Sequence, residues 1–86
     1  IQLLQELLWA YGPCGQEYAV REICLRELAP VVDSAWVDKA GNVVGRVSSS
    51  AADEEHSPIR VMAHMDELSM LVKRIQPDGR VRLTPL

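Results

Sequence analysis

Three side chains suited to metal or acid–base chemistry, His64, Asp66 and Glu67, directly follow an apolar run over residues 59–63. A neutral imidazole binds a metal ion through one ring nitrogen, and a carboxylate commonly holds the other ring N–H and fixes the ring. If the run is a strand that continues through these residues, side chains two apart share a face, so His64 and Asp66 lie together. The spacing favours a metal ligand oriented by an aspartate, and it also fits a structural His–Asp hydrogen bond.

Other hydrolytic arrangements fit these residues less well. A glycosidase needs two carboxyl groups that face each other across a sugar bond, about 5–10 Å apart, whereas Asp66 and Glu67 on a strand point to opposite faces. A serine or cysteine triad needs a nucleophile beside a histidine. The chain has two histidines, His56 and His64, and neither has a convincing nucleophile partner. The residues therefore disfavour both classes of enzyme.

The remaining candidate ligands have simpler interpretations. His56 lies in a polar, acidic segment over residues 48–58. We interpret this segment as a solvated loop, because ordering it around a ligand costs conformational entropy at every residue. Cys14 is interpreted as a small turn residue and Cys24 as a small core residue of a helix. Two isolated cysteines form no disulfide framework and fit a reduced cytoplasm.

Two helices are predicted to precede the motif. Four leucines at helical spacing predict a first helix that Gly12-Pro13 ends, since proline cannot continue a helix; these are Leu3, Leu4, Leu7 and Leu8. A second helix is predicted from about Gln16 to Leu28, with Glu17 in its first turn, where the helix dipole favours an acid. Its expected buried stripe comprises Val20, Ile23, Cys24 and Leu28.

Strands are predicted over most of the remaining chain. Residues 34–38 and 42–47 flank a turn and predict a hairpin, and residues 70–75 and 81–84 predict a second hairpin around a strong turn signal. Residues 59–63, which are apolar apart from Arg60, predict a compact strand that lacks its sheet neighbours within this chain. The predicted fold class is α/β, with two helices followed by about five strands.

Composition excludes several functions. The net charge is −3, with both signs mixed along the chain, so no footprint for nucleic acid or an anionic membrane is present. The basic residues near the end of the sequence are interpreted as an exposed hairpin face; they are Lys73, Arg74, Arg80 and Arg82. No apolar run approaches the roughly 18 residues of a membrane span, and no signal-peptide pattern occurs.

The ordered motifs resemble the N-terminal part of the M42-family metalloaminopeptidases, the glutamyl and tetrahedral aminopeptidase group, which is sometimes called endoglucanase or cellulase. The strongest matching motif is Ala63-His64-Met65-Asp66-Glu67. The other matching segments fall in the family's order and spacing and cover almost the whole chain; they are residues 12–17, 20–22, 38–42, 70–75, 78–79 and 83–86.

The resemblance implies a fold, a chemistry and an assembly. It implies a three-layer α/β zinc-peptidase (phosphorylase/hydrolase-like) domain, with residues 1–67 in this catalytic domain and residues 68–86 as a hairpin at the start of, or leading into, an inserted β domain. It assigns His64 as a metal ligand and Asp66 as the catalytic residue that orients it. The implied cofactors are two divalent ions, zinc or cobalt, and the implied setting is a cytoplasmic homo-oligomer, often a dodecamer, that acts on peptides.

The chain alone is expected to be an incomplete enzyme. It begins at Ile1 without Met and stops at Leu86 within an alternating run, so we expect a segment of a longer protein. By resemblance, the remaining ligands, including a bridging aspartate and a general-base glutamate, lie beyond Leu86. The full-length parent is expected to be an aminopeptidase and the segment itself to be inactive. The alternative is a non-catalytic, stand-alone fragment that acts only through assembly with a partner chain.

Overall fold

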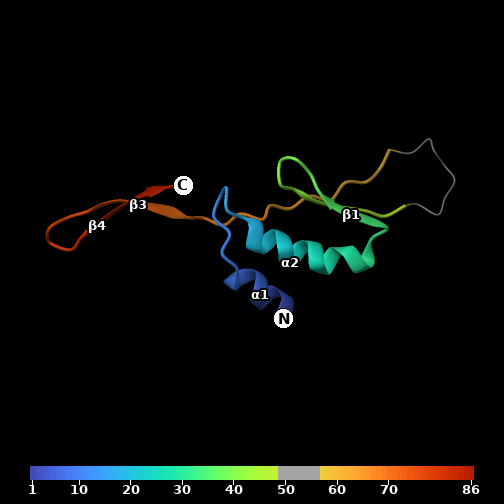
Figure 1. Ribbon diagram of the computed structural model, residues 1–86, viewed down its shortest axis with the longest axis horizontal. Helices are drawn as coiled ribbons and strands as arrows, with labels where there is room; N and C mark the ends of the chain where they lie inside the picture. Colours follow the sequence, from blue (N-terminus) through green and yellow to red (C-terminus); the bar gives the residue numbers. More distant parts are fainter. Residues whose placement is uncertain (49–56) are drawn as a thin grey trace. The chain divides into compact units, whose positions relative to one another are not determined.

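The computed structural model of the chain describes residues 1–48 and 57–86. Most of the predicted loop around His56 therefore lies outside the described residues. The elements are helices α1 (Gln2–Trp9) and α2 (Tyr18–Leu28), the 3-10 turn η1 (Ala29–Val31), and strands β1 (Ser34–Val37), β2 (Val43–Arg46), β3 (Met70–Ile75) and β4 (Val81–Pro85) (Figure 1). The strands form two separate antiparallel pairs, β1–β2 and β3–β4. The predicted α/β class is confirmed, together with both helices and both hairpins.

The described residues form two compact units. One unit comprises Ile1–Val20 and Met65–Leu86, and the other comprises Arg21–His64. Helix α2 contributes to both. It carries the two large apolar side chains that are buried within residues 1–48 and 57–86, Val20 at 7% exposure and Ile23 at 9%. No described helix has the length and apolar character needed to cross a membrane.

The β1–β2 hairpin packs against the end of α2 within the unit Arg21–His64. Ala35 pairs with Gly45 across the hairpin. A Cβ on Gly45 would lie 2.6 Å from Cδ2 of Leu28 and 3.0 Å from Cγ1 of Val32. Since carbon atoms in contact normally stay about 3.5–4.0 Å apart, the strand comes this close to the helix because glycine has no side chain.

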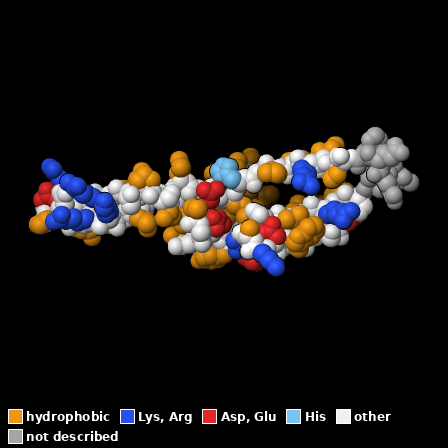
Figure 2. Space-filling view, turned by 90° about the horizontal axis from the view of Figure 1, so that it is seen from above, with side chains coloured by type: hydrophobic (Ala, Val, Ile, Leu, Met, Phe, Trp, Pro, Cys, Tyr) orange, Lys and Arg blue, Asp and Glu red, His pale blue; other side chains and the backbone are white. Residues whose placement is uncertain are grey.

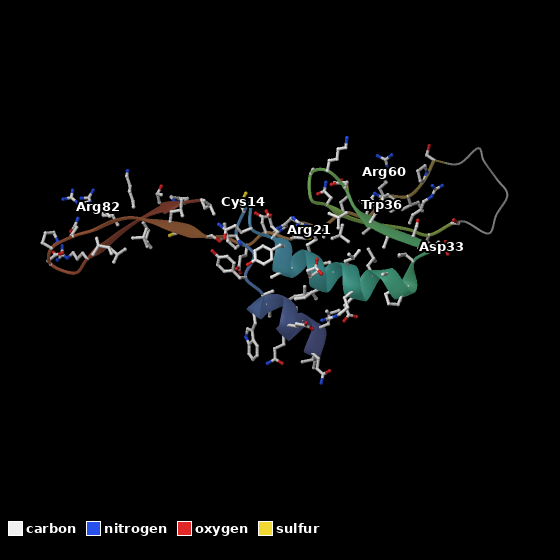
Figure 3. All side chains as sticks on the ribbon, in the orientation of Figure 1. Cys14, Arg21, Asp33, Trp36, Arg60 and Arg82 are labelled. Carbon is white, nitrogen blue, oxygen red and sulfur yellow. The ribbon has the colours of Figure 1, made fainter. Side chains whose placement is uncertain are left out.

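Asp38 closes the turn of this hairpin, and a side chain of α2 donates a hydrogen bond to it. The Asp38 carboxylate accepts the backbone N–H groups of Ala40 and Asn42 and the Asn42 side-chain amide. Gly41 has φ +89°, a conformation that glycine adopts without steric cost. Its carbonyl accepts a 2.8 Å hydrogen bond from Nε of Arg21, near the start of α2 (Figure 3).

The β3–β4 hairpin is amphipathic but exposed on both faces. Three of its cross-strand pairs are wholly apolar. Their members in β4 are two residues apart, so the pairs lie on one face of the hairpin; they are Met70–Pro85, Val72–Leu83 and Ile75–Val81. Arg74 lies opposite Arg82, and Lys and Arg side chains gather over this hairpin (Figure 2). The predicted basic hairpin face is therefore confirmed as exposed.

Two sequence predictions need correction. Residues 59–63 are not a β-strand, and no described strand pairs with them; Ile59 and Val61 are each 94% exposed. A strand requires partners for its N–H and C=O groups, so the apolar run alone does not produce one, and the described residues hold four strands rather than five. Helix α2 begins at Tyr18 rather than near Gln16, so Glu17 precedes the helix.

Candidate functional site

His64 and Asp66 lie on the connection that leads from the apolar run into β3. Both are exposed, neither belongs to a regular strand, and each has an interaction partner in the structure. The sequence suggested that strand alternation places the two side chains on one face. Since neither residue is in a strand, this argument does not apply. Both side chains are accessible in the structure.

Glu67, immediately after Asp66, is anchored to the turn between α1 and α2. Its backbone N–H donates a 2.9 Å hydrogen bond to the carbonyl of Gly12. The backbone N–H of Gly12 donates in return to Oε1 of Glu67 at 3.3 Å. Pro13 and Glu67 form an isolated parallel bridge. The sequence did not predict this contact: Glu67 was considered as a glycosidase carboxyl group, which its position disfavours, and as part of the family motif.

Gly12 lies against α2 in this turn, at a position with no room for a side chain. Gly12 and Pro13 are buried. A Cβ at Gly12 would lie 2.7 Å from Cγ2 of Val20 and 3.6 Å from the carbonyl oxygen of Met65. Val20 is β-branched within α2, so it has little rotamer freedom with which to move aside. The glycine thus lets Val20 of α2 pack against the helix–helix turn.

The turn itself is closed by local hydrogen bonds. The Gln16 N–H donates to the Pro13 carbonyl at 2.8 Å, and the Gly15 N–H donates to Oε1 of Glu17 at 2.7 Å. Gly15 has φ +86°. Cys14 projects from this turn as an exposed free thiol, as predicted for a turn residue (Figure 3). Cys24 is a free, half-buried thiol on α2.

A metal site would require more ligands than the described residues bring together. Within 1–48 and 57–86, no three side chains of His, Cys, Asp or Glu lie together in a group that could hold a metal ion. A zinc site takes three or four protein ligands, so His64 fits as a single ligand, with a carboxylate two residues away. The donor chemistry is suitable, and further ligands would have to come from elsewhere.

The carboxyl group of Asp38, in the turn between β1 and β2, has a lowered pKa. Hydrogen bonds from the Asn42 side-chain amide, the Asn42 backbone N–H and the Ala40 backbone N–H hold the pKa of the Asp38 carboxyl below its ordinary value. Each bond favours the charged form of the carboxylate. Asp38 therefore stabilises the β1–β2 turn as an anion, and these hydrogen bonds account for its lowered pKa.

Comparison with known proteins identifies a family to which the chain is similar. Residues 41–86 match the model of the M42 glutamyl aminopeptidases. The chain is 30% identical over 86 residues to a lysyl aminopeptidase of Pyrococcus furiosus, covering 99% of this chain and 23% of that protein. It is 37% identical over 81 residues to the putative aminopeptidase SgcX of Escherichia coli, covering 94% and 21%.

A third relative is the putative aminopeptidase FrvX of Escherichia coli, which is 33% identical over 86 residues, covering 100% of this chain and 23% of that protein. The chain thus spans less than a quarter of the length of the relatives it matches. No solved structure matches it.

Proposed function

Since this chain belongs to the M42 glutamyl aminopeptidase family, we propose that it is the N-terminal segment of a metal-dependent enzyme that removes N-terminal residues from peptides. The observation that carries the proposal is the position of His64-Met65-Asp66-Glu67 within the matched residues 41–86. The relatives are named as aminopeptidases, one of them lysyl. Because the chain spans only part of each relative, the activity is proposed for the longer protein.

In this proposal His64 is one ligand of a two-metal site. One imidazole nitrogen binds a divalent ion, zinc or cobalt, and the Asp66 carboxylate accepts the other ring N–H and fixes the ring for binding. When bound, such ions polarise the substrate carbonyl and lower the pKa of a coordinated water. Residues beyond Leu86 supply the other ligands and the general base. The 86-residue segment alone is then inactive.

The proposal extends to architecture and setting. Residues 1–67 form part of a three-layer α/β catalytic domain, and residues 68–86 begin or lead into an inserted β domain. The self-contained β3–β4 pairing supports this division, because β3 and β4 hydrogen-bond only to each other among the described strands. We place the enzyme in the cytoplasm as a homo-oligomer of dodecameric type.

Activity of the full-length protein tests the proposal directly. Aminoacyl arylamides should be hydrolysed, with loss of activity on chelation and recovery with Zn²⁺ or Co²⁺, whereas cellulose derivatives should not be cleaved. His64→Ala should lower kcat/KM at least about a hundredfold, because losing a ligand should cost at least as much as losing a group that orients one, which costs about 10–100-fold. His56→Ala, at the other histidine of the chain, is the matched control and should retain activity. Equal activity of the two variants would contradict the role of His64.

A further inference from the structure

The backbone next to Asp66 is anchored to Gly12. Glu67 and Gly12 exchange hydrogen bonds of 2.9 and 3.3 Å. The Met65 carbonyl oxygen also lies near Gly12, 3.6 Å from the position that a Cβ there would take. Asp66 directly precedes Glu67, so the hydrogen bonds of Glu67 locate the backbone on the C-terminal side of Asp66.

The carboxylate of Glu67 has a specific task in this arrangement. Gly12 is buried, so its N–H group requires a partner within the protein. Glu67 provides a charged acceptor, which makes a stronger hydrogen bond than a neutral one. At 3.3 Å this bond is the longer of the two. It adds to a backbone bond that any residue except proline could donate at this position.

The anchor continues toward the β3–β4 hairpin. The Ser69 hydroxyl donates to the carbonyl of Glu67 at 3.2 Å, and the carbonyl of Ser69 accepts the N–H of Leu86 at 3.0 Å. Glu67 is therefore tied on one side to the helix–helix turn and on the other, through Ser69, to Leu86 next to β4. A displacement of Glu67 would be transmitted to Asp66 next to it.

We propose that Glu67 is a positioning residue, which clamps the backbone at Asp66 to Gly12 and thereby fixes the carboxylate that orients His64. This inference rests on the proposed function of His64 and Asp66. Glu67 itself touches neither metal nor substrate in this scheme; it acts through the backbone. Its side chain matters as an acceptor for the Gly12 N–H, so a glutamine can replace it, whereas an alanine cannot.

Amide hydrogen exchange of the metal-free, full-length protein tests the clamp without any activity measurement. In Glu67→Ala, peptides that contain Gly12 or Glu67 should exchange about tenfold faster, as expected for loss of a hydrogen bond to a charged group. Glu67→Gln keeps an acceptor oxygen and should change exchange by about threefold or less. Unchanged exchange in Glu67→Ala would overturn the proposal.

Binding of Co²⁺, whose visible absorption reports on its ligands, then tests the positioning role. Glu67→Ala should weaken Co²⁺ binding about tenfold, the lower end of the range for groups that orient a ligand, and Glu67→Gln should restore it. Glu17→Ala is the matched control, because Glu17 accepts a backbone N–H in the same turn, but from Gly15 rather than from Gly12. An equal loss in Glu17→Ala, or no loss in Glu67→Ala, would overturn the proposal.

His64→Ala separates this inference from the function on which it rests. It should abolish Co²⁺ binding at this position and leave the metal-free exchange of Gly12 and Glu67 unchanged. Co²⁺ binding that survives His64→Ala would refute the metal site, and with it the positioning role, even if the exchange data for Glu67→Ala show the clamp. Normal binding at His64 combined with normal exchange in Glu67→Ala would refute the clamp alone.

Discussion

Substitution of Gly12 by alanine should destabilise the protein through a contact that the structure locates. The new Cβ would lie 2.7 Å from Cγ2 of Val20, about 1 Å inside normal carbon–carbon contact. Val20 is 7% exposed, so its side chain cannot swing into solvent. Overpacking of this kind costs about 1–3 kcal/mol.

A smaller effect opposes this cost. Gly12 does not have a positive φ, unlike Gly15, Gly41 and Gly79, so alanine suits its backbone and reduces the entropy of the unfolded chain. That term stabilises by about 0.4–1 kcal/mol. The contact is the larger of the two, and we expect the free energy of unfolding of Gly12→Ala to fall by roughly 1–2 kcal/mol.

A double-mutant cycle identifies the responsible contact. Val20→Ala removes the atom that Gly12→Ala would meet, so urea unfolding of the full-length double variant should show it to be more stable than the sum of the single changes by about 1 kcal/mol or more. Gly15→Ala is the matched control: no atom lies within 4 Å of its Cβ position but its φ is +86°, so its cost should add to that of Val20→Ala. Additive behaviour of Gly12→Ala and Val20→Ala, or a net gain in stability from Gly12→Ala, would refute the contact argument.

Three further outcomes are expected. Gly45→Ala should cost about 1–3 kcal/mol of stability in urea unfolding, because its Cβ would meet Leu28 at 2.6 Å; a neutral effect would contradict the close packing of hairpin on helix. The pKa of Asp38 is lower in the folded protein than in the unfolded chain. Its stabilisation of the β1–β2 turn is therefore fully present above the pKa of the unfolded chain, about 3.9, and is lost as the pH falls through the lower pKa of the folded protein. Amide exchange at Asn42, corrected for intrinsic rates, should therefore rise in this acidic range, and Asp38→Ala should remove that pH dependence. Isothermal titration of the 86-residue chain with Zn²⁺ should show no tight site that depends on His64, and a tight site lost in His64→Ala would contradict the incomplete ligand set.

Local features of the fold were predictable from the sequence. The leucine spacing of α1, the proline that follows it, and the turn residues of both hairpins act over a few neighbouring positions, so each pattern specifies its own element. The predicted start of α2 lies about two residues too early because Glu17 suits a first helical turn. In the structure its carboxylate accepts the Gly15 N–H instead.

Features that depend on distant residues could not be predicted in the same way. The run over residues 59–63 has the composition of a strand, but a strand exists only where a neighbour pairs with it, and no described strand does. The contact between Gly12 and Glu67 joins positions 55 residues apart. Both residues stood in motifs that the sequence singled out, yet nothing in their types showed that they meet. The assignment of His64 and Asp66 stays a prediction based on family resemblance.

The exposed apolar run has a consequence for how the proposed longer protein is synthesised. Chains emerge from the ribosome in sequence order, and every further 100 residues or so takes roughly 5–20 s to make. Any strand that pairs with residues 59–63 from beyond Leu86 is therefore translated after them. During that interval Ile59 and Val61, each 94% exposed, form an extended apolar segment of the kind that chaperones bind, so nascent-chain crosslinking should capture a chaperone at this run.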